Sequence, residues 1–181
     1  MITTRNLVRS AVAAAIIGAT AVTTVGVANA APRAPWGEAQ EIVDAFPELL
    51  PTSPSSLGYH GASCSADTNP SQDSGANVAI NCVDSDDVYV DVFAYINPRG
   101  IENALATLDL TAPTEATLDD GSYYTYYELA NADGGTVVFI TFESSTLEDY
   151  LMVVSKEGAT FDEIAATWGQ DAPIGGTSIG M

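Results

Sequence analysis

The two cysteines of the chain, Cys64 and Cys82, enclose a segment rich in oxygen-bearing side chains, SCSADTNPSQDSGANVAINC. Three kinds of chemistry could use such a segment: a disulfide, a metal-binding loop or a reactive thiol. We favour the disulfide, because each cysteine lies in a predicted strand and the chain begins with an export signal. By the loop-entropy model, a ring of this length stabilises the fold by about 3 kcal/mol.

A reactive thiol would need a base, and His60 is the single histidine of the chain. It precedes Cys64 by four residues, and an even offset on a strand places both side chains on one face. Export would oxidise the cysteine pair, however, and a zinc site with two cysteines would need carboxylates as its remaining ligands. His60 could also respond to pH between 5 and 8. We expect instead a surface histidine without a chemical role.

The polar loop resembles the start of a calcium-binding loop, because oxygen-bearing side chains occupy alternate positions. It departs from the EF-hand pattern at Gln72, where glycine is required, and at Val78, where a bidentate Glu is required. An irregular calcium site is the remaining alternative, either in this loop or at Asp84, Asp86 and Asp87, whose carboxylates repel one another without a cation. The main expectation is a plain acidic turn, with no metal and no cofactor.

Aromatic side chains supply a candidate contact surface. One predicted strand places Tyr89, Phe93 and Tyr95 on one face, and the run YYTYY separates Tyr124 and Tyr126 from its other tyrosines. An open sheet face with these rings would bind sugars, peptides or apolar lipids. A third layer, such as the N-terminal helix, would bury them instead. The candidate ligand-binding residues are Tyr89, Phe93, Tyr95, Tyr124 and Tyr126.

The motifs of the common enzyme classes do not occur in the sequence: we find no nucleophile elbow, P-loop, dinucleotide-binding glycine pattern or HExxH. Beyond the export signal, the basic side chains are His60, Lys156, Arg33 and Arg99, a thin stock of bases and oxyanion donors. We expect a non-catalytic protein that binds an envelope or extracellular ligand or protein. The alternatives are a hydrolase using His60 and carboxylates, and an acidic inhibitory or structural protein.

The first thirty residues have the features of a signal peptide. Arg5 and Arg9 precede the apolar run 11–27, and the small residues Ala28 and Ala30 mark a cleavage site after position 30. A membrane-anchored N-terminus is the alternative, because the run is about long enough to cross a bilayer. No later apolar run of that length follows, so we expect a secreted or extracytoplasmic product without a stable membrane span. The expected organisation is a signal peptide over 1–30, one α+β domain over 31–174 and a flexible tail over 175–181.

The chain is strongly acidic, with 5 basic and 24 acidic residues and a net charge of −19. Removal of the signal peptide leaves three basic residues against the same 24 acidic ones, a net charge of −21. Such a surface repels phosphate backbones and anionic headgroups, which argues against nucleic-acid binding. The acidity keeps the protein in solution, and it would attract cations or basic partners.

Hydrophobic spacing predicts three helices and six strands. The clearest strand, 87–97, alternates valines with aromatic and polar residues. Asn97 and Pro98 begin a helix that extends to Leu108, and Thr160 with Glu163 forms a capping box before the last helix. The remaining elements are a helix over 37–46 and strands over 57–65, 77–83, 123–130, 136–144 and 150–156.

The order of these elements predicts an α+β fold, in which a largely antiparallel sheet of five or six strands packs with two or three helices as a two- or three-layer sandwich. Strands in consecutive runs exclude a doubly wound parallel sheet, and the helices exclude an all-β sandwich.

The segments FPELLP, GYHGASC, INC and TWGQDAPI are similar to those of small secreted domains of actinobacteria. These domains include the sensor-type ectodomains of serine/threonine kinases and the LpqN-type envelope lipoproteins. The resemblance implies an extracytoplasmic location. The chain has no kinase domain, no lipid-attachment cysteine and no second disulfide, so neither a signalling role nor any functional residue carries over.

Overall fold

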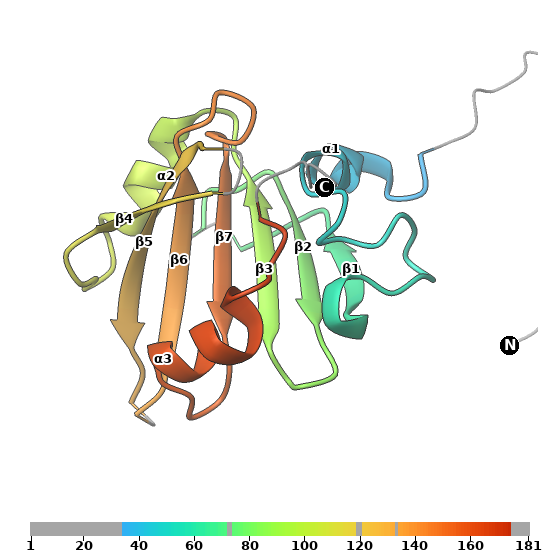
Figure 1. The fold of residues 1–181 in the computed structure, drawn as a ribbon. Coiled ribbons are helices and arrows are strands. Elements are labelled where there is room, and N and C mark those ends of the chain that lie inside the picture. The colour runs from blue at the N-terminus through green and yellow to red at the C-terminus, as the bar shows by residue number, and fades with distance from the viewer. Residues whose placement is uncertain (1–33, 72–73, 119–120, 133, 175–181) are drawn as a thin grey trace, which may run out of the picture. The chain divides into compact units, whose positions relative to one another are not determined.

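One antiparallel sheet organises the protein, with seven strands among the described residues, in the order β1-β2-β3-β7-β6-β5-β4 (Figure 1). The structure is a computed structural model that describes residues 34–71, 74–118, 121–132 and 134–174. The strands are β1 (Ser63–Asp67), β2 (Val78–Val83), β3 (Tyr89–Ala94), β4 (Thr114–Thr117), β5 (Tyr123–Ala130), β6 (Thr136–Phe142) and β7 (Tyr150–Ser155). The predicted α+β class is confirmed, with one strand more than expected.

Alternation along the strands gives the sheet two different faces. On β3, Val90 and Val92 are buried on one face, which we call face A, whereas Asp91 and Phe93 are half-buried on the opposite face, face B. Across the β3–β7 pair, Val90 lies opposite Val154 and Asp91 lies opposite Val153, so the same division continues through the sheet.

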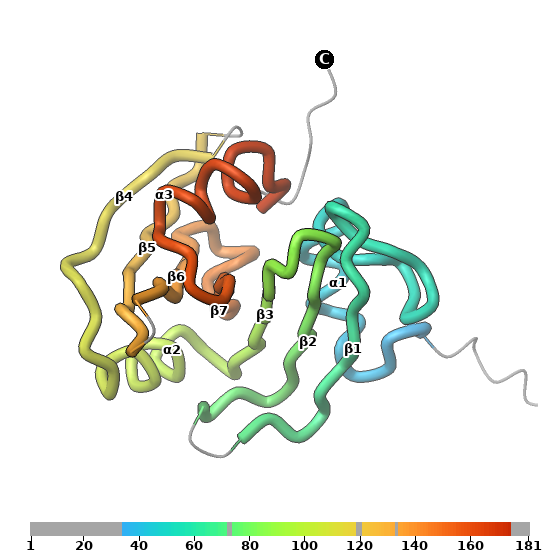
Figure 2. The backbone as a smooth tube through the Cα atoms, turned by 90° about the horizontal axis from the view of Figure 1, so that it is seen from below, coloured from blue at the N-terminus to red at the C-terminus, as the bar shows by residue number. Residues whose placement is uncertain are grey.

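Helices cover the two faces unequally (Figure 2). Face A carries α1 (Gln40–Ala45), which follows a 3₁₀ turn at Gly37–Ala39, and α3 (Phe161–Ile164), which continues as a π-helical turn at Ala165–Gly169. Face B carries α2 (Pro98–Leu105), whose Ile101 packs with buried Phe139 and Leu151. The result is a three-layer arrangement.

The larger of the two apolar cores lies on face A. Phe46, at the end of α1, is fully buried, and its ring centroid lies 5.4 Å from that of Phe142 and 5.6 Å from that of Tyr150. Ile42 and Ile164 belong to the same core, which therefore connects the first and last helices across face A. Burying side chains of this size supplies about 1.5–3 kcal/mol each.

The disulfide predicted from the cysteine pair is confirmed. Cys64 on β1 lies directly opposite Cys82 on β2, and their sulfur atoms are 2.04 Å apart. The bond ties edge strand β1 to the sheet on face A, where Cys82 joins the core. It also rules out the free thiol that the reactive-site alternative required.

The last helix begins as its sequence predicts. The Glu163 amide donates to Thr160 Oγ1 at 3.4 Å, and the Thr160 amide donates to Glu163 Oε2 at 2.8 Å, which together form the capping box. The Glu163 carboxylate accepts hydrogen bonds from both the Thr160 amide and, at 3.0 Å, the Thr160 hydroxyl, and these two bonds lower its pKa. The cap starts the turn that places Ile164 and Trp168 against face A.

Several predicted bounds are wrong, and one strand was not predicted. The strand predicted over 57–65 begins only at Ser63, because Tyr59–Gly61 forms a 3₁₀ turn in which His60 has a positive φ of 52°. Helix α2 ends at Leu105, before Leu108. Strand β4 lies in a segment predicted as a connection, since an edge strand with mostly exposed residues shows no apolar alternation.

The predicted signal peptide, 1–30, and the predicted tail, 175–181, lie outside the described residues. Within the described ranges, no helix is long and apolar enough to cross a bilayer.

Candidate functional site

A cavity of about 420 Å³ lies between face A and the last helical segment. Its sheet side comes from three adjacent strands, β5, β6 and β7. The side chains on these strands are mostly buried and apolar or aromatic: Tyr124, Tyr126, Val138, Ile140 and Val154. All five share face A, because they occupy alternating positions in paired strands.

The opposite wall of the cavity is α3 and the π-helical turn that follows it. Phe161, Ile164, Ala165 and Trp168 contribute to this wall. The Phe161 ring stacks on Tyr126, with centroids 5.0 Å apart and an interplanar angle of 9°, so the wall is held against the sheet by an aromatic pair. Burial and the neighbouring Tyr126 raise the pKa of Tyr124, which keeps its hydroxyl neutral at physiological pH.

Polar groups at the cavity are few and carry no positive charge. The lining residues with polar side chains are Asp162 and Gln170, both exposed, together with Tyr124 and Tyr126. Among the described residues, neither Arg99 nor Lys156 belongs to the lining. The site therefore offers aromatic and aliphatic contacts, with an acidic rim.

The five aromatic residues proposed from the sequence do not form one surface. Tyr124 and Tyr126 line the cavity on face A, whereas Tyr89 and Phe93 lie on face B. Tyr95 is buried in the face B core, and its hydroxyl donates to the Ser74 carbonyl oxygen at 3.1 Å. Tyr89 is 49% exposed, so face B retains one accessible ring of the three.

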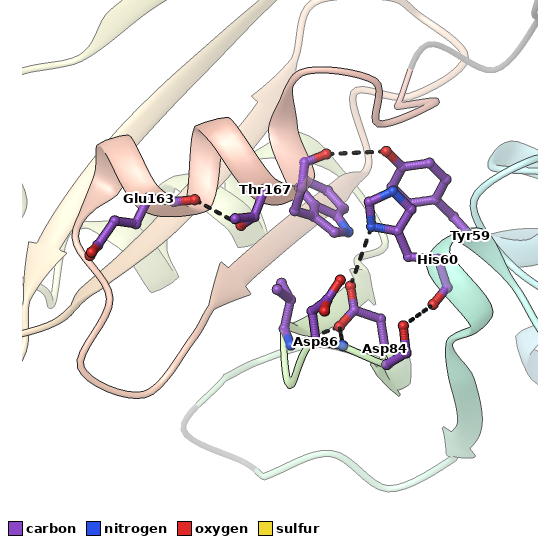
Figure 3. A network of polar contacts seen from close by, with 9 residues as sticks. Tyr59, His60, Asp84, Asp86, Glu163 and Thr167 are labelled. Carbon is purple, nitrogen blue, oxygen red and sulfur yellow. Dashed lines mark hydrogen bonds and ion pairs between the residues drawn. The ribbon is translucent and has the colours of Figure 1, made fainter.

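A polar cluster at the β2–β3 turn brings His60 together with Asp84 and Asp86 (Figure 3). One ligand atom from each of the three side chains lies within 4.8 Å of the others. The cluster thus includes two of the three calcium candidates, Asp84 and Asp86. Asp87 contributes no atom to it and has a positive φ of 60°.

The Asp84 carboxylate organises this turn. Its Oδ1 accepts hydrogen bonds from the amides of Asp86 at 2.8 Å and Val88 at 2.9 Å. Its Oδ2 lies 3.7 Å from His60 Nδ1, and the Asp84 side chain is only 1% exposed. One carboxylate oxygen therefore holds the turn while the other is directed at the imidazole.

His60 is held through both its ring and its backbone. It stacks on the Tyr59 ring, with centroids 4.0 Å apart, and its backbone carbonyl accepts hydrogen bonds from the Ser85 amide and hydroxyl. Histidine is one of the residues that adopt a positive φ more readily than most. The turn thus presents Nδ1 to Asp84 while the side chain stays one-third exposed.

The His60 Nδ1 and Asp84 Oδ2 atoms are close enough for an ion pair but too far apart for a hydrogen bond. In the part of the chain that the structure describes, neither atom has a hydrogen-bond partner, and both are buried. Unpaired buried polar atoms are rare in folded proteins and call for an explanation.

Tyr59 connects the polar cluster to Trp168, which lines the cavity. The Tyr59 hydroxyl donates to the Trp168 carbonyl oxygen at 3.3 Å, and the two rings meet edge to face at 6.1 Å. Burial, followed by Asp171 and Asp84, raises the pKa of Tyr59. The hydroxyl therefore stays protonated and able to donate.

Spacing along the sequence pairs His60 with Cys64 and does not indicate the contact of His60 with Asp84. The signal was present in the disulfide: if Cys64 faces Cys82 in an antiparallel pair, two further steps outward bring position 62 opposite Asp84. The residues just before β1 must then lie beside the β2–β3 turn. The cavity had no comparable signal, because it depends on how a short helix packs on a sheet.

No protein-family model, curated protein or solved structure matches the chain.

Proposed function

We propose that this protein is an exported, non-catalytic binding domain whose face A cavity holds an uncharged or cationic ligand with an apolar body. The cavity between the sheet and α3 is the observation that carries the proposal. Its volume of about 420 Å³ lies in the range of small-molecule sites, about 300–1,000 Å³. Such sites combine apolar walls with few polar groups, as this one does.

The charge of the site defines the ligand class. Asp162 lies at the rim, and no described basic residue lines the cavity. The chain as a whole carries a net charge of −19. An anionic head group would therefore meet repulsion without a compensating cation, whereas a neutral or positively charged group would not.

The disulfide supports a location outside the cytoplasm. Such bonds persist in oxidising compartments and are rare where thiols are kept reduced. Cys64 and Cys82 form the bond in a strand pair, where it closes the β1–β2 connection. We propose that the domain acts at the cell envelope or beyond it, where apolar molecules need a carrier or receptor in water.

Dye displacement tests the proposal. The purified full chain is titrated with N-phenyl-1-naphthylamine, a neutral apolar dye whose fluorescence rises on burial, and the dye is then displaced by three matched C12 compounds. We expect dodecanol and dodecylamine to displace the dye, and dodecanoate to compete at least about tenfold less well. Absence of dye binding, or preference for dodecanoate, would contradict the proposal.

A matched pair of variants locates the binding. Ala165→Phe adds a ring to the cavity wall, whereas Ala104→Phe adds the same ring on α2, at face B. Both alanines are half-buried and helical. We expect Ala165→Phe to weaken dye binding about tenfold or more, and Ala104→Phe to leave it within about twofold of the wild type. Equal binding by both variants would place the dye elsewhere.

A further inference from the structure

We propose that His60, Asp84 and Asp86 form a binding site for a divalent transition-metal cation of the Zn²⁺ type, joining the turn before β1 to the β2–β3 turn. This site lies outside the face A cavity, and the proposal does not depend on what the cavity binds. It rests on the cluster geometry and, independently, on the buried unpaired atoms that face each other in it.

The separation of the two buried atoms fits a shared cation. Zinc lies about 2.0–2.1 Å from imidazole nitrogen and about 2.0–2.2 Å from carboxylate oxygen. His60 Nδ1 and Asp84 Oδ2 lie 3.7 Å apart. With these bond lengths, the N–metal–O angle at a cation between them would be about 125°. Shortening that separation by about 0.3 Å gives the tetrahedral angle that zinc sites prefer.

The burial of these atoms is the independent observation. The Asp84 side chain is 1% exposed, and, within the described residues, its Oδ2 has no hydrogen-bond partner. Leaving a buried carboxylate oxygen without a hydrogen bond is costly, and His60 Nδ1 likewise has no hydrogen-bond partner among the described residues. A cation between the two atoms would satisfy both at once, which a plain acidic turn would not do.

The ligand set selects the class of metal. An imidazole nitrogen with two carboxylates suits Zn²⁺ and neighbouring first-row ions, whereas Ca²⁺ takes six to eight oxygen ligands. Asp86 is exposed and within 4.8 Å of the other ligands, so its carboxylate can close on the ion from the solvent side. Water would complete the coordination. The site therefore differs in metal class from the calcium site considered from the sequence.

The surroundings hold the two inner ligands in place. Two amides fix the Asp84 carboxylate through Oδ1, which leaves Oδ2 available. Stacking on Tyr59 and two hydrogen bonds from Ser85 to its carbonyl oxygen fix His60. Supporting contacts of this kind orient metal ligands and account for part of the affinity. The acidic surface would also raise the local concentration of cations.

Isothermal titration of the metal-free full chain with ZnCl₂ tests the proposal. We expect one site per chain in the wild type. Asp84→Asn keeps an Oδ1 acceptor for the two amides but replaces Oδ2, and His60→Asn keeps a residue that tolerates a positive φ. Each should weaken Zn²⁺ binding roughly tenfold or more. Asp87→Asn makes the same charge change in the same turn outside the cluster, and should bind within about twofold of the wild type.

Nuclear magnetic resonance of His60 detects metal binding in the wild-type protein, so the result does not depend on whether a variant folds correctly. The chain has one histidine, so its imidazole ¹⁵N signals are assigned without ambiguity. We expect Zn²⁺ to shift the Nδ1 signal, while Ca²⁺ and Mg²⁺ at equal concentration leave it unchanged. No Nδ1 shift with Zn²⁺, equal binding by His60→Asn, or a preference for Ca²⁺ would overturn the proposal.

Discussion

The two faces of the sheet use the same strands but differ in what covers them. Face A has α1 at one side and α3 at the other, and its core extends from Trp36 to Ile174. Among the described residues, face B has the eight-residue α2 and a core of four buried side chains. The two helical segments on face A leave an apolar cavity between α3 and the sheet, whereas face B holds an ionisable side chain, Asp91, on the sheet itself.

Asp91 illustrates the difference between the faces. It lies on face B of central strand β3, opposite Asn81 on β2 and Val153 on β7. Burial raises the pKa of its carboxyl from 3.8 to about 6. An aspartate at a neighbouring position of β3 would point into the core of face A. There, a charge without a partner would lower the stability of the fold far more.

The largest expected difference between the faces comes from removing one phenylalanine on each. Phe46→Ala deletes a fully buried ring on face A, and Phe93→Ala deletes a half-buried ring on face B. We expect Phe46→Ala to lower the free energy of unfolding by about 3–5 kcal/mol, and Phe93→Ala by about half as much, because less apolar area is lost. Urea unfolding followed by circular dichroism measures both. Equal losses of unfolding free energy in the two variants would show that the helices do not bury the two faces unequally.

The disulfide adds a second difference between the two faces, because it fastens β1 on face A. The double variant Cys64→Ala with Cys82→Ala opens the ring, and we expect it to lower the free energy of unfolding by about 3 kcal/mol. Reduction of the wild type by dithiothreitol should give a similar loss in the same urea assay. A loss below about 1 kcal/mol would show that the face A core holds the edge strand without the bond.

A smaller change is expected at Asp91, where Asp91→Asn should raise the free energy of unfolding by an amount that depends on pH. Because the folded-state pKa is raised, the folded protein holds the Asp91 proton more tightly than the unfolded chain. Stability is therefore lost as pH rises from about 4 to about 6, and the penalty is complete above that window. A two-unit shift corresponds to about 3 kcal/mol, and partial exposure reduces the expected gain from Asp91→Asn to about 1–2 kcal/mol.

Thermal unfolding at pH 3.5 and pH 7.5 checks this prediction. Asp91→Asn and the wild type should unfold at similar temperatures at the lower pH, and the variant should be more stable at the higher pH. Asp109→Asn serves as a control, because Asp109 is exposed and the substitution makes the same charge change. If Asp91→Asn raised the unfolding temperature at pH 3.5 alone, the raised pKa of Asp91 would be contradicted.

The sequence predicts the parts of this fold that depend on local pattern. Alternation locates β3, the capping box locates the start of α3, and cysteine usage predicts the disulfide. Strand β4 escapes prediction because its four residues are mostly exposed and lie at the sheet edge. The turn at His60 escapes because its positive φ has no sequence signal beyond the adjacent glycine.

The candidate sites are less predictable, because they depend on contacts between distant segments. The spacing of Tyr124 and Tyr126 places them on one face but cannot show that Phe161 stacks against them. The meeting of His60 with Asp84 likewise requires the β1–β2 register. Side-chain types therefore identify candidate chemistry, whereas the packing of short helical segments decides which candidates meet.

The two tryptophans provide the most direct test of the central claim that the face A cavity binds an apolar ligand. Trp168 lines the cavity, whereas Trp36 does not and is buried elsewhere on face A, with its indole donating to the Pro51 carbonyl oxygen. In a ¹H–¹⁵N spectrum of the full chain titrated with dodecanol, we expect the Trp168 indole signal to shift and saturate while the Trp36 signal stays in place. A shift confined to Trp36, or no saturable shift at Trp168, would contradict the account.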